Sequence, residues 1–184
     1  MMFQKTRLEG SFLIDIEARA DDRGFFARCF CEKEFARVGL NTHWVQVNNS
    51  MSSKKGTLRG LHFQRPPHAE AKLIRCLKGS VWDVVVDLRE GSKTFGEWFG
   101  STLSDQNRTM MYVPEGFAHG YISLEQHSEI LYLVSSTYTP AAEGTLIWND
   151  PEVGIKWPME PVVISEKDMS GNALKNIPHI DLES

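Results

Sequence analysis

The segment Arg59-Gly-Leu-His-Phe-Gln64 places an imidazole in apolar surroundings, beside polar side chains that suit proton transfer. A histidine in an apolar strand is more often structural than catalytic. Here Gly60 permits a bulge or a close backbone approach. Strict alternation along a strand puts His62 and Gln64 on one face and Arg59 on the other. We therefore expect these three side chains to line one pocket only if Gly60 bends the strand.

The segment Pro114-Glu-Gly-Phe-Ala-His-Gly120 carries a second candidate histidine, His119. Its Pro-x-Gly-x-x-His spacing predicts a turn that leads into a strand, and it is similar to the second signature of the cupin superfamily of small jelly-roll barrels. Where cupins usually offer a metal-binding His-x-His pair, this chain has His62-Phe-Gln64. Because carboxamides are poor ligands for first-row metals compared with imidazole, the sequence predicts a site without a metal. A metal-dependent cupin enzyme is the alternative.

Two further residues suit acid–base chemistry. Tyr132 shares a strand face with two aliphatic residues, so we expect its ring to be buried and its hydroxyl to need a partner. That hydroxyl serves either as a structural group bonded to backbone or as a general acid. Asp168, in Ser165-Glu-Lys-Asp168, reads on its own as an ordinary surface carboxylate.

Short β-strands must position these residues. The clearest is Val81–Leu88, where Val81, Asp83, Val85 and Asp87 alternate with the residues of the opposite face. Turn residues separate the other predicted strands, which are Trp44–Val47, Thr57–Phe63, Lys72–Leu77, Met110–Val113, Gly120–Leu124, Ile130–Val134 and Thr145–Trp148. One short helix is predicted at Cys31–Val38, with Gly39 as its C-terminal cap. Many short strands and few helices predict an all-β sandwich, barrel or jelly roll.

Composition narrows the class of protein. The 184 residues, 41% hydrophobic and 24% charged, fit a single domain over residues 1-184. No apolar run approaches the ~20 residues that span a bilayer, so we expect no membrane segment. The N-terminus turns polar too soon for a secretory signal, and the three cysteines form no disulfide or zinc pattern, which favours the cytoplasm. A net charge of −4 argues against a dedicated nucleic-acid binder.

Positive charge is concentrated in one segment. Between Ser50 and Lys78 the chain carries seven cations and a single acid, Glu70. Such a segment is either a solvated face or the place where an anionic ligand binds.

Together these segments resemble the dTDP-4-dehydrorhamnose 3,5-epimerase family. The resemblance runs from Asp22-Arg-Gly-Phe25 to Asp168, nearly the whole chain, and several blocks in the right order make it specific. The blocks are Gly56-Thr-Leu-Arg-Gly-Leu-His-Phe-Gln64, Ala71-Lys-Leu-Ile-Arg75, Val84-Val-Val-Asp-Leu88, Thr94-Phe-Gly96, Pro114-Glu-Gly-Phe-Ala-His-Gly120, Trp148-Asn-Asp-Pro151 and Ser165-Glu-Lys-Asp168.

The resemblance implies a cupin-type jelly-roll homodimer that converts dTDP-4-keto-6-deoxyglucose to dTDP-4-keto-rhamnose without a cofactor, usually for deoxysugar and polysaccharide biosynthesis. It implies that His62 is the general base, oriented by Asp168, that Tyr132 is the acid on the other face, and that Lys72 is the cation near the 4-keto oxygen. It places His119 and Arg59 at the substrate or its diphosphate. The remaining nucleotide and sugar contacts that it implies are Arg23, Phe25, Gln46, Asn48 and Tyr138.

These residue types suit the chemistry. A proton next to a ketone is acidic only if the enolate is stabilised, and a cation at the oxygen contributes roughly 10²–10³ in rate. Imidazole removes protons near neutral pH, and a carboxylate behind it fixes its tautomer. The basic segment then reads as a diphosphate site.

Three positions depart from the family pattern. Arg28 stands where the family commonly has an acid, and Val47 and Asn49 change the family's Gln-Asp-Asn-His-Ser run. These changes fall where the nucleotide base and sugar are expected, so a CDP-linked substrate and epimerisation at C3 or C5 alone are the alternatives. A binding protein without catalysis and a 3,4-ketoisomerase are less favoured, because His62 and Tyr132 are both present.

Overall fold

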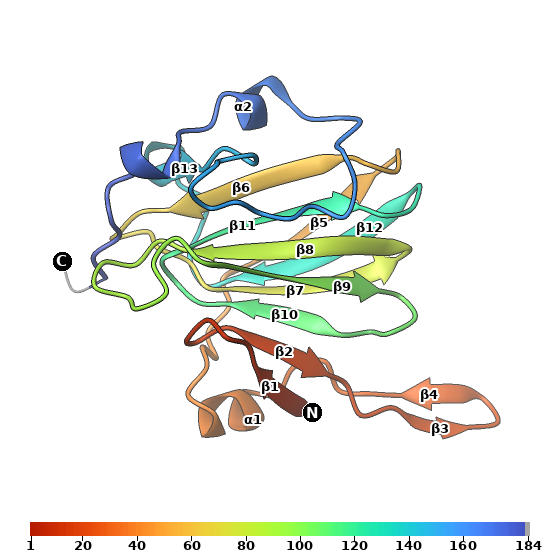
Figure 1. The fold of residues 1–184 in the computed structure, drawn as a ribbon. Helices are drawn as coiled ribbons and strands as arrows, with labels where there is room; N and C mark the ends of the chain where they lie inside the picture. The colour runs from red at the N-terminus through yellow and green to blue at the C-terminus, as the bar shows by residue number, and fades with distance from the viewer. Residues whose placement is uncertain (183–184) are drawn as a thin grey trace.

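The computed structural model of the chain describes residues 1–182, which form two facing β-sheets and a projecting hairpin (Figure 1). The larger sheet has six strands in the order β1-β2-β10-β7-β12-β5. In chain order these strands are β1 (Met2–Lys5), β2 (Phe12–Asp15), β5 (Gln46–Ser52), β7 (Lys72–Lys78), β10 (Met110–Val113) and β12 (Ser128–Val134). Every pairing within this sheet is antiparallel.

The smaller sheet has five antiparallel strands in the order β13-β6-β11-β8-β9. Its strands are β6 (Leu58–Gln64), β8 (Ser80–Asp87), β9 (Trp98–Ser104), β11 (Phe117–Ser123) and β13 (Glu143–Thr145). Two antiparallel sheets, packed face to face with neighbours that are mostly not consecutive in sequence, make a jelly-roll barrel. The predicted all-β jelly-roll class is confirmed.

The remaining elements are short. Strands β3 (Arg19–Asp21) and β4 (Gly24–Phe26) form a hairpin that projects away from the barrel (Figure 1). The helical elements are α1 (Glu32–Arg37), α2 (Glu166–Met169) and the 3₁₀ turns η1 (Pro140–Ala142) and η2 (Leu174–Asn176). None of the helices within residues 1–182 has the length and apolar character to cross a membrane.

The core lies between the sheets and continues outside the smaller one. Val81 and Val85 of β8 point into the barrel, where they pack with residues of both sheets. Val84 and Val86 point outward and are covered by the C-terminal segment that includes Leu146. Both faces of β8 are therefore buried, which explains its continuous apolar sequence.

The outer face of the larger sheet is covered only in part. The segment around α1 packs Phe35 against β2, β7 and β10. On the β5 side, Val47 and Met51 are 59% and 51% exposed, and Leu77 of β7 is 41% exposed. This side leaves apolar side chains without cover from the described residues.

Most predicted elements exist, with shifted ends. β10 matches its prediction, and α1 lies within the predicted Cys31–Val38. The predicted strand Trp44–Val47 begins only at residue 46 and runs five residues further, while Thr145–Trp148 contributes only its first residue to β13. Strands β1 to β4, strand β9 and helix α2 were not predicted, because they are short or rich in polar residues and glycine.

Candidate active site

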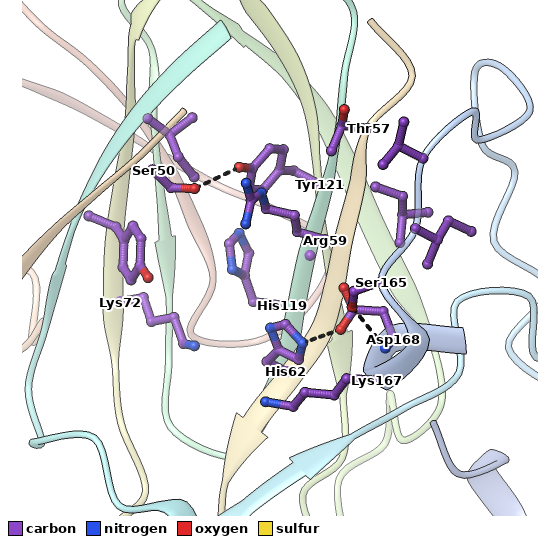
Figure 2. Close-up of a pocket in the computed structure, with 16 residues that line it drawn as sticks. Ser50, Thr57, Arg59, His62, Lys72, His119, Tyr121, Ser165, Lys167 and Asp168 are labelled. Atoms are coloured by element: carbon purple, nitrogen blue, oxygen red, sulfur yellow. Dashed lines mark hydrogen bonds and ion pairs between the residues drawn. The ribbon is translucent and has the colours of Figure 1, made fainter. Parts of the chain in front are cut away.

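A cavity of about 390 Å³ lies between the sheets, beside the segment that contains α2 (Figure 2). A second cavity of about 290 Å³ shares His62, Lys72 and Tyr132 with it, so the two are parts of one recess. The polar and charged side chains that line the recess are Gln46, Asn48, Ser50, Thr57, Arg59, His62, Gln64, Glu70, Lys72, His119, Tyr121, Tyr132, Tyr138, Glu143, Ser165, Lys167 and Asp168.

A bulge in β6 brings Arg59 and His62 to the same recess. His119 of β11 pairs with His62, but Tyr121 pairs with Arg59, so β6 uses one more residue than β11 over this stretch. Gly60 lies in the bulge with a φ of 118°. The bend that the sequence required is confirmed, and Arg59, His62 and Gln64 all line the recess.

His62 and Asp168 form a hydrogen-bonded pair. His62 Nε2 is 2.7 Å from Asp168 Oδ1, and their side chains are 32% and 6% exposed. The Gly60 N–H donates to the other carboxylate oxygen, and Ser165 caps α2 by accepting from the Asp168 N–H. Burial alone would raise the pKa of Asp168. The hydrogen bond to His62, the attraction of its charge, and the hydrogen bonds with Gly60 and Ser165 hold that pKa below its ordinary value. Asp168 is therefore an anion that orients the imidazole.

Tyr132 lies across the recess from His62. It comes from β12 of the larger sheet, whereas His62 comes from β6 of the smaller one. The Tyr132 hydroxyl makes no hydrogen bond with any residue in the described range 1–182. Burial raises its pKa, nearby Glu70 and Tyr121 raise it further, and Arg59 opposes them. The phenol therefore holds its proton and is available as a donor.

Lys72 and His119 are both held by carboxylates. Lys72 Nζ is 2.9 Å from Glu70 Oε1, and both side chains are nearly buried. His119 Nε2 is 2.9 Å from Oδ2 of Asp83, a fully buried residue of β8. The recess thus holds a cation and a second imidazole at fixed positions.

The residues expected to bind nucleotide and sugar fall into two groups. Gln46, Asn48 and Tyr138 line the second cavity, where Gln46 Nε2 donates to Asn48 Oδ1 over 2.8 Å. Arg23 and Phe25 lie on the β3–β4 hairpin and line neither cavity. The Arg23 side chain is 90% exposed and pairs with its neighbour Asp21.

Sequence reasoning missed Glu143, Lys167 and Glu70 as site residues. Lys167 Nζ contacts both oxygens of Glu143 at 2.7 and 2.6 Å, and the Tyr138 hydroxyl donates to Glu143 over 3.0 Å. Lys167 belongs to the Ser165–Asp168 block, and its place next to Asp168 could have marked it as a site residue. Nothing local marks Glu143, and Glu70 stood out only as the acid of the basic segment.

Gln64, at the position where cupins usually have a second metal-binding histidine, makes three hydrogen bonds to backbone. Gln64 Nε2 donates to the carbonyls of His68 and Thr137, and its Oε1 accepts from the Thr139 N–H at 2.6 Å. These bonds tie two loops at the edge of the recess. Within residues 1–182, no group of three or more His, Cys, Asp or Glu side chains is arranged to hold a metal ion.

Comparison with known proteins finds similarity to dTDP-4-dehydrorhamnose 3,5-epimerases over nearly the whole chain. The protein-family model described as dTDP-4-dehydrorhamnose 3,5-epimerase matches residues 5–176. The dTDP-4-dehydrorhamnose 3,5-epimerase of Methanothermobacter thermautotrophicus is 44% identical over 179 residues, which cover 96% of this chain and 96% of that protein.

Solved structures of similar sequence share the fold. The dTDP-6-deoxy-D-glucose-3,5-epimerase of Legionella pneumophila, in complex with dTDP-4-keto-L-rhamnose, has a TM-score of 0.90 at 37% identity and covers 96% of this chain and 94% of its own. The 3'-monoepimerase ChmJ of Streptomyces bikiniensis, in complex with dTDP-quinovose, has a TM-score of 0.87 at 33% identity and covers 94% of this chain and 87% of its own.

Proposed function

The chain belongs to the dTDP-4-dehydrorhamnose 3,5-epimerase family, and from this premise we propose that it is an isomerase acting on a nucleotide-linked 4-keto-6-deoxy sugar. Its substrate is dTDP-4-dehydro-6-deoxy-D-glucose, and its product, after inversion at C3 and C5, is dTDP-4-dehydro-L-rhamnose. The observation that carries the proposal is the position of His62 and Tyr132, which face one recess from opposite sheets.

In the proposed mechanism, His62 removes the proton from the carbon next to the ketone. Its pairing with anionic Asp168 supports this role, since the carboxylate fixes the ring and stabilises the imidazolium that forms. The enolate oxygen is met by the ammonium of Lys72, an oxyanion-type stabilisation that lowers the barrier to proton removal.

Tyr132 returns a proton from the opposite face, which inverts the carbon. Two observations support this role. His62 and Tyr132 lie on opposite sheets, and the pKa of the phenol is raised, mainly by burial. Arg59 and His119 bind the substrate or its diphosphate. Positioned acid–base groups contribute about 10²–10⁴ in rate.

The residues that we propose to bind the nucleotide do not all line this recess. Gln46, Asn48 and Tyr138 line it, whereas Arg23 and Phe25 lie on the projecting hairpin. We propose a homodimer in which this hairpin reaches the recess of the partner. The exposed apolar side chains of the hairpin and of β5 support such an interface, with Phe26 71% exposed.

The finer assignments complete the proposal. Residues 1-184 act as one domain of the cupin superfamily in the cytoplasm, and proton transfer needs no cofactor. The cupin assignment is supported by the jelly-roll arrangement of the two sheets and by the Pro-x-Gly-x-x-His turn that leads into β11.

The test is proton NMR of dTDP-4-keto-6-deoxyglucose with the enzyme in D₂O. We expect deuterium to enter at both C3 and C5 and the rhamno product to form. Exchange at one carbon would support the second candidate, a mono-epimerase, which the likeness to the 3'-monoepimerase favours. Exchange with the CDP-linked analogue but not with the dTDP sugar would show that the substrate carries CDP. No exchange with either substrate would overturn the proposal.

A further inference from the structure

Glu70, the acid of the basic segment, lies inside the recess against Lys72. The two charged atoms are 2.9 Å apart, and the side chains are 11% and 8% exposed. Glu70 belongs to the loop before β7. Two hydrogen bonds with Ser135 hold the next residue, Ala71. The Ala71 N–H donates to Ser135 Oγ, and the Ser135 N–H donates to the Ala71 carbonyl. These bonds hold the backbone next to Glu70, and Lys72 is the partner of its carboxylate.

Folding stability does not explain this pair. Removing two charges from water is costly, and replacing a buried ion pair with apolar residues is often neutral or stabilising. Glutamate and lysine are almost never fully buried unless they are paired. The pair lies in a cavity beside Tyr132 and His62, so its charges act where the chemistry is proposed.

The other carboxylates that line the recess already have partners of their own. Asp168 is bound to His62, and Glu143 is bound to Lys167. Glu70 is left as the anion that faces both Lys72 and Tyr132. The remaining titratable or charged side chains that line the recess are Arg59, His119, Tyr121 and Tyr138.

We propose that Glu70 is a positioning residue of this enzyme, whose carboxylate holds the Lys72 ammonium in the recess and keeps negative charge beside Tyr132. This inference rests on the proposed function, in which Lys72 stabilises the enolate and Tyr132 donates the proton. It deepens that function by adding a residue that acts through Lys72 and Tyr132. The pKa of Tyr132, raised first by burial and then by Glu70, is consistent with this role.

The test is the pH profile of the Glu70→Gln variant. Glutamine keeps the shape and removes the charge, so Lys72 loses its anchor and the pKa of Tyr132 falls. A general acid loses its proton, and with it its activity, as the pH rises through its pKa. Because the pKa of Tyr132 is lowered in this variant, the alkaline limb of the kcat profile should move to lower pH. We expect kcat to fall about 10- to 100-fold because the cation is misplaced, with a smaller change in KM.

Two variants serve as controls. Glu125→Gln removes a carboxylate from an exposed turn and should leave the profile unchanged. Glu70→Asp keeps the charge, so its alkaline limb should stay near the wild-type position even if its kcat is lower. If Glu70→Gln lowers kcat without moving the alkaline limb, or if it behaves like Glu125→Gln, the proposal is overturned.

A measurement without turnover separates this inference from the proposed function. The chain has four tyrosines, so the absorbance change of tyrosinate formation can be followed with pH, and comparison with Tyr132→Phe identifies the contribution of Tyr132. In Glu70→Gln that contribution should appear at lower pH. A wild-type protein that turns over no sugar overturns the proposed function, while an unmoved Tyr132 titration overturns the role of Glu70.

Discussion

Inversion of a carbon next to a ketone needs one group to remove a proton and another to return it from the other face. In the proposed mechanism His62 and Tyr132 divide these tasks, because the imidazole is bound to an anion and the partly buried phenol has a raised pKa. We predict that His62→Ala loses both deuterium exchange and inversion by about 10²–10⁴-fold. Tyr132→Phe should lose more inversion than exchange. Proton NMR in D₂O measures both quantities in one experiment.

A matched control is Tyr112→Phe, which removes a buried hydroxyl that lies outside the recess and accepts from the Asn41 N–H. It should leave exchange and inversion coupled as in the wild type. Near-normal turnover by His62→Ala would remove the assignment of the base. Equal losses of exchange and inversion in Tyr132→Phe would count against the assignment of the acid.

At the scale of the element, the bulge of β6 decides which side chains share the recess. A Cβ atom at residue 60 would lie 2.6 Å from Gly120 Cα and 2.7 Å from the His119 carbonyl oxygen, on a backbone with φ of +118°. Gly60→Ala must therefore push β6 away from β11 or flatten the bulge. We predict a loss of about 3 kcal/mol or more in the free energy of unfolding, measured by urea denaturation, together with loss of turnover.

Gly91→Ala is the control for backbone strain alone. Gly91 also has a positive φ, of +69°, but an added Cβ would meet nothing within 4 Å. It should cost about 1 kcal/mol and leave turnover unchanged. If Gly60→Ala were no more costly than Gly91→Ala, the close contact between β6 and β11 would not be what holds the bulge.

The same element shows how far the sequence leads. Periodicity identified β8 and most of β6, and Gly60 marked the place where β6 had to bend. Periodicity did not predict β9, whose polar residues and glycine weaken the alternating pattern. It also did not predict the ends of β5 and β13, which are set by pairing with β12 and β6. Local pattern predicts a strand, whereas its length depends on its neighbours.

Contacts between distant residues lay beyond local pattern. Asp168 reads as a surface acid, yet it is buried against His62, 106 residues away. Only the family resemblance anticipated this pair. The bond between Lys167 and Glu143 was not anticipated at all, because two ordinary surface residue types meet only once β13 and α2 lie at the same edge of the recess.

At the scale of the whole molecule, the proposed site is divided between two parts of the chain. The recess lies inside the barrel, while Arg23 and Phe25 project from it on the β3–β4 hairpin (Figure 1). In the proposed homodimer, these residues contact the nucleotide bound by the second copy of the chain. The apolar side of the larger sheet, with Val47 and Met51 exposed, provides a surface on which that copy can pack.

Mixing two inactive variants tests this arrangement. His62→Ala removes the base but keeps the hairpin, and Arg23→Ala keeps the base but removes the guanidinium that the hairpin is proposed to supply. In a mixed dimer, the Arg23→Ala protomer supplies an intact recess and its partner supplies an intact hairpin, so one complete site forms. Random mixing after reversible dissociation should restore about a quarter of the wild-type activity, because half of the dimers are mixed and each holds one good site of two. Light scattering would establish the dimer independently. If a mixture of proven mixed dimers gained no activity, each protomer would have to bind its nucleotide alone, and the hairpin would have no role in the site of its partner.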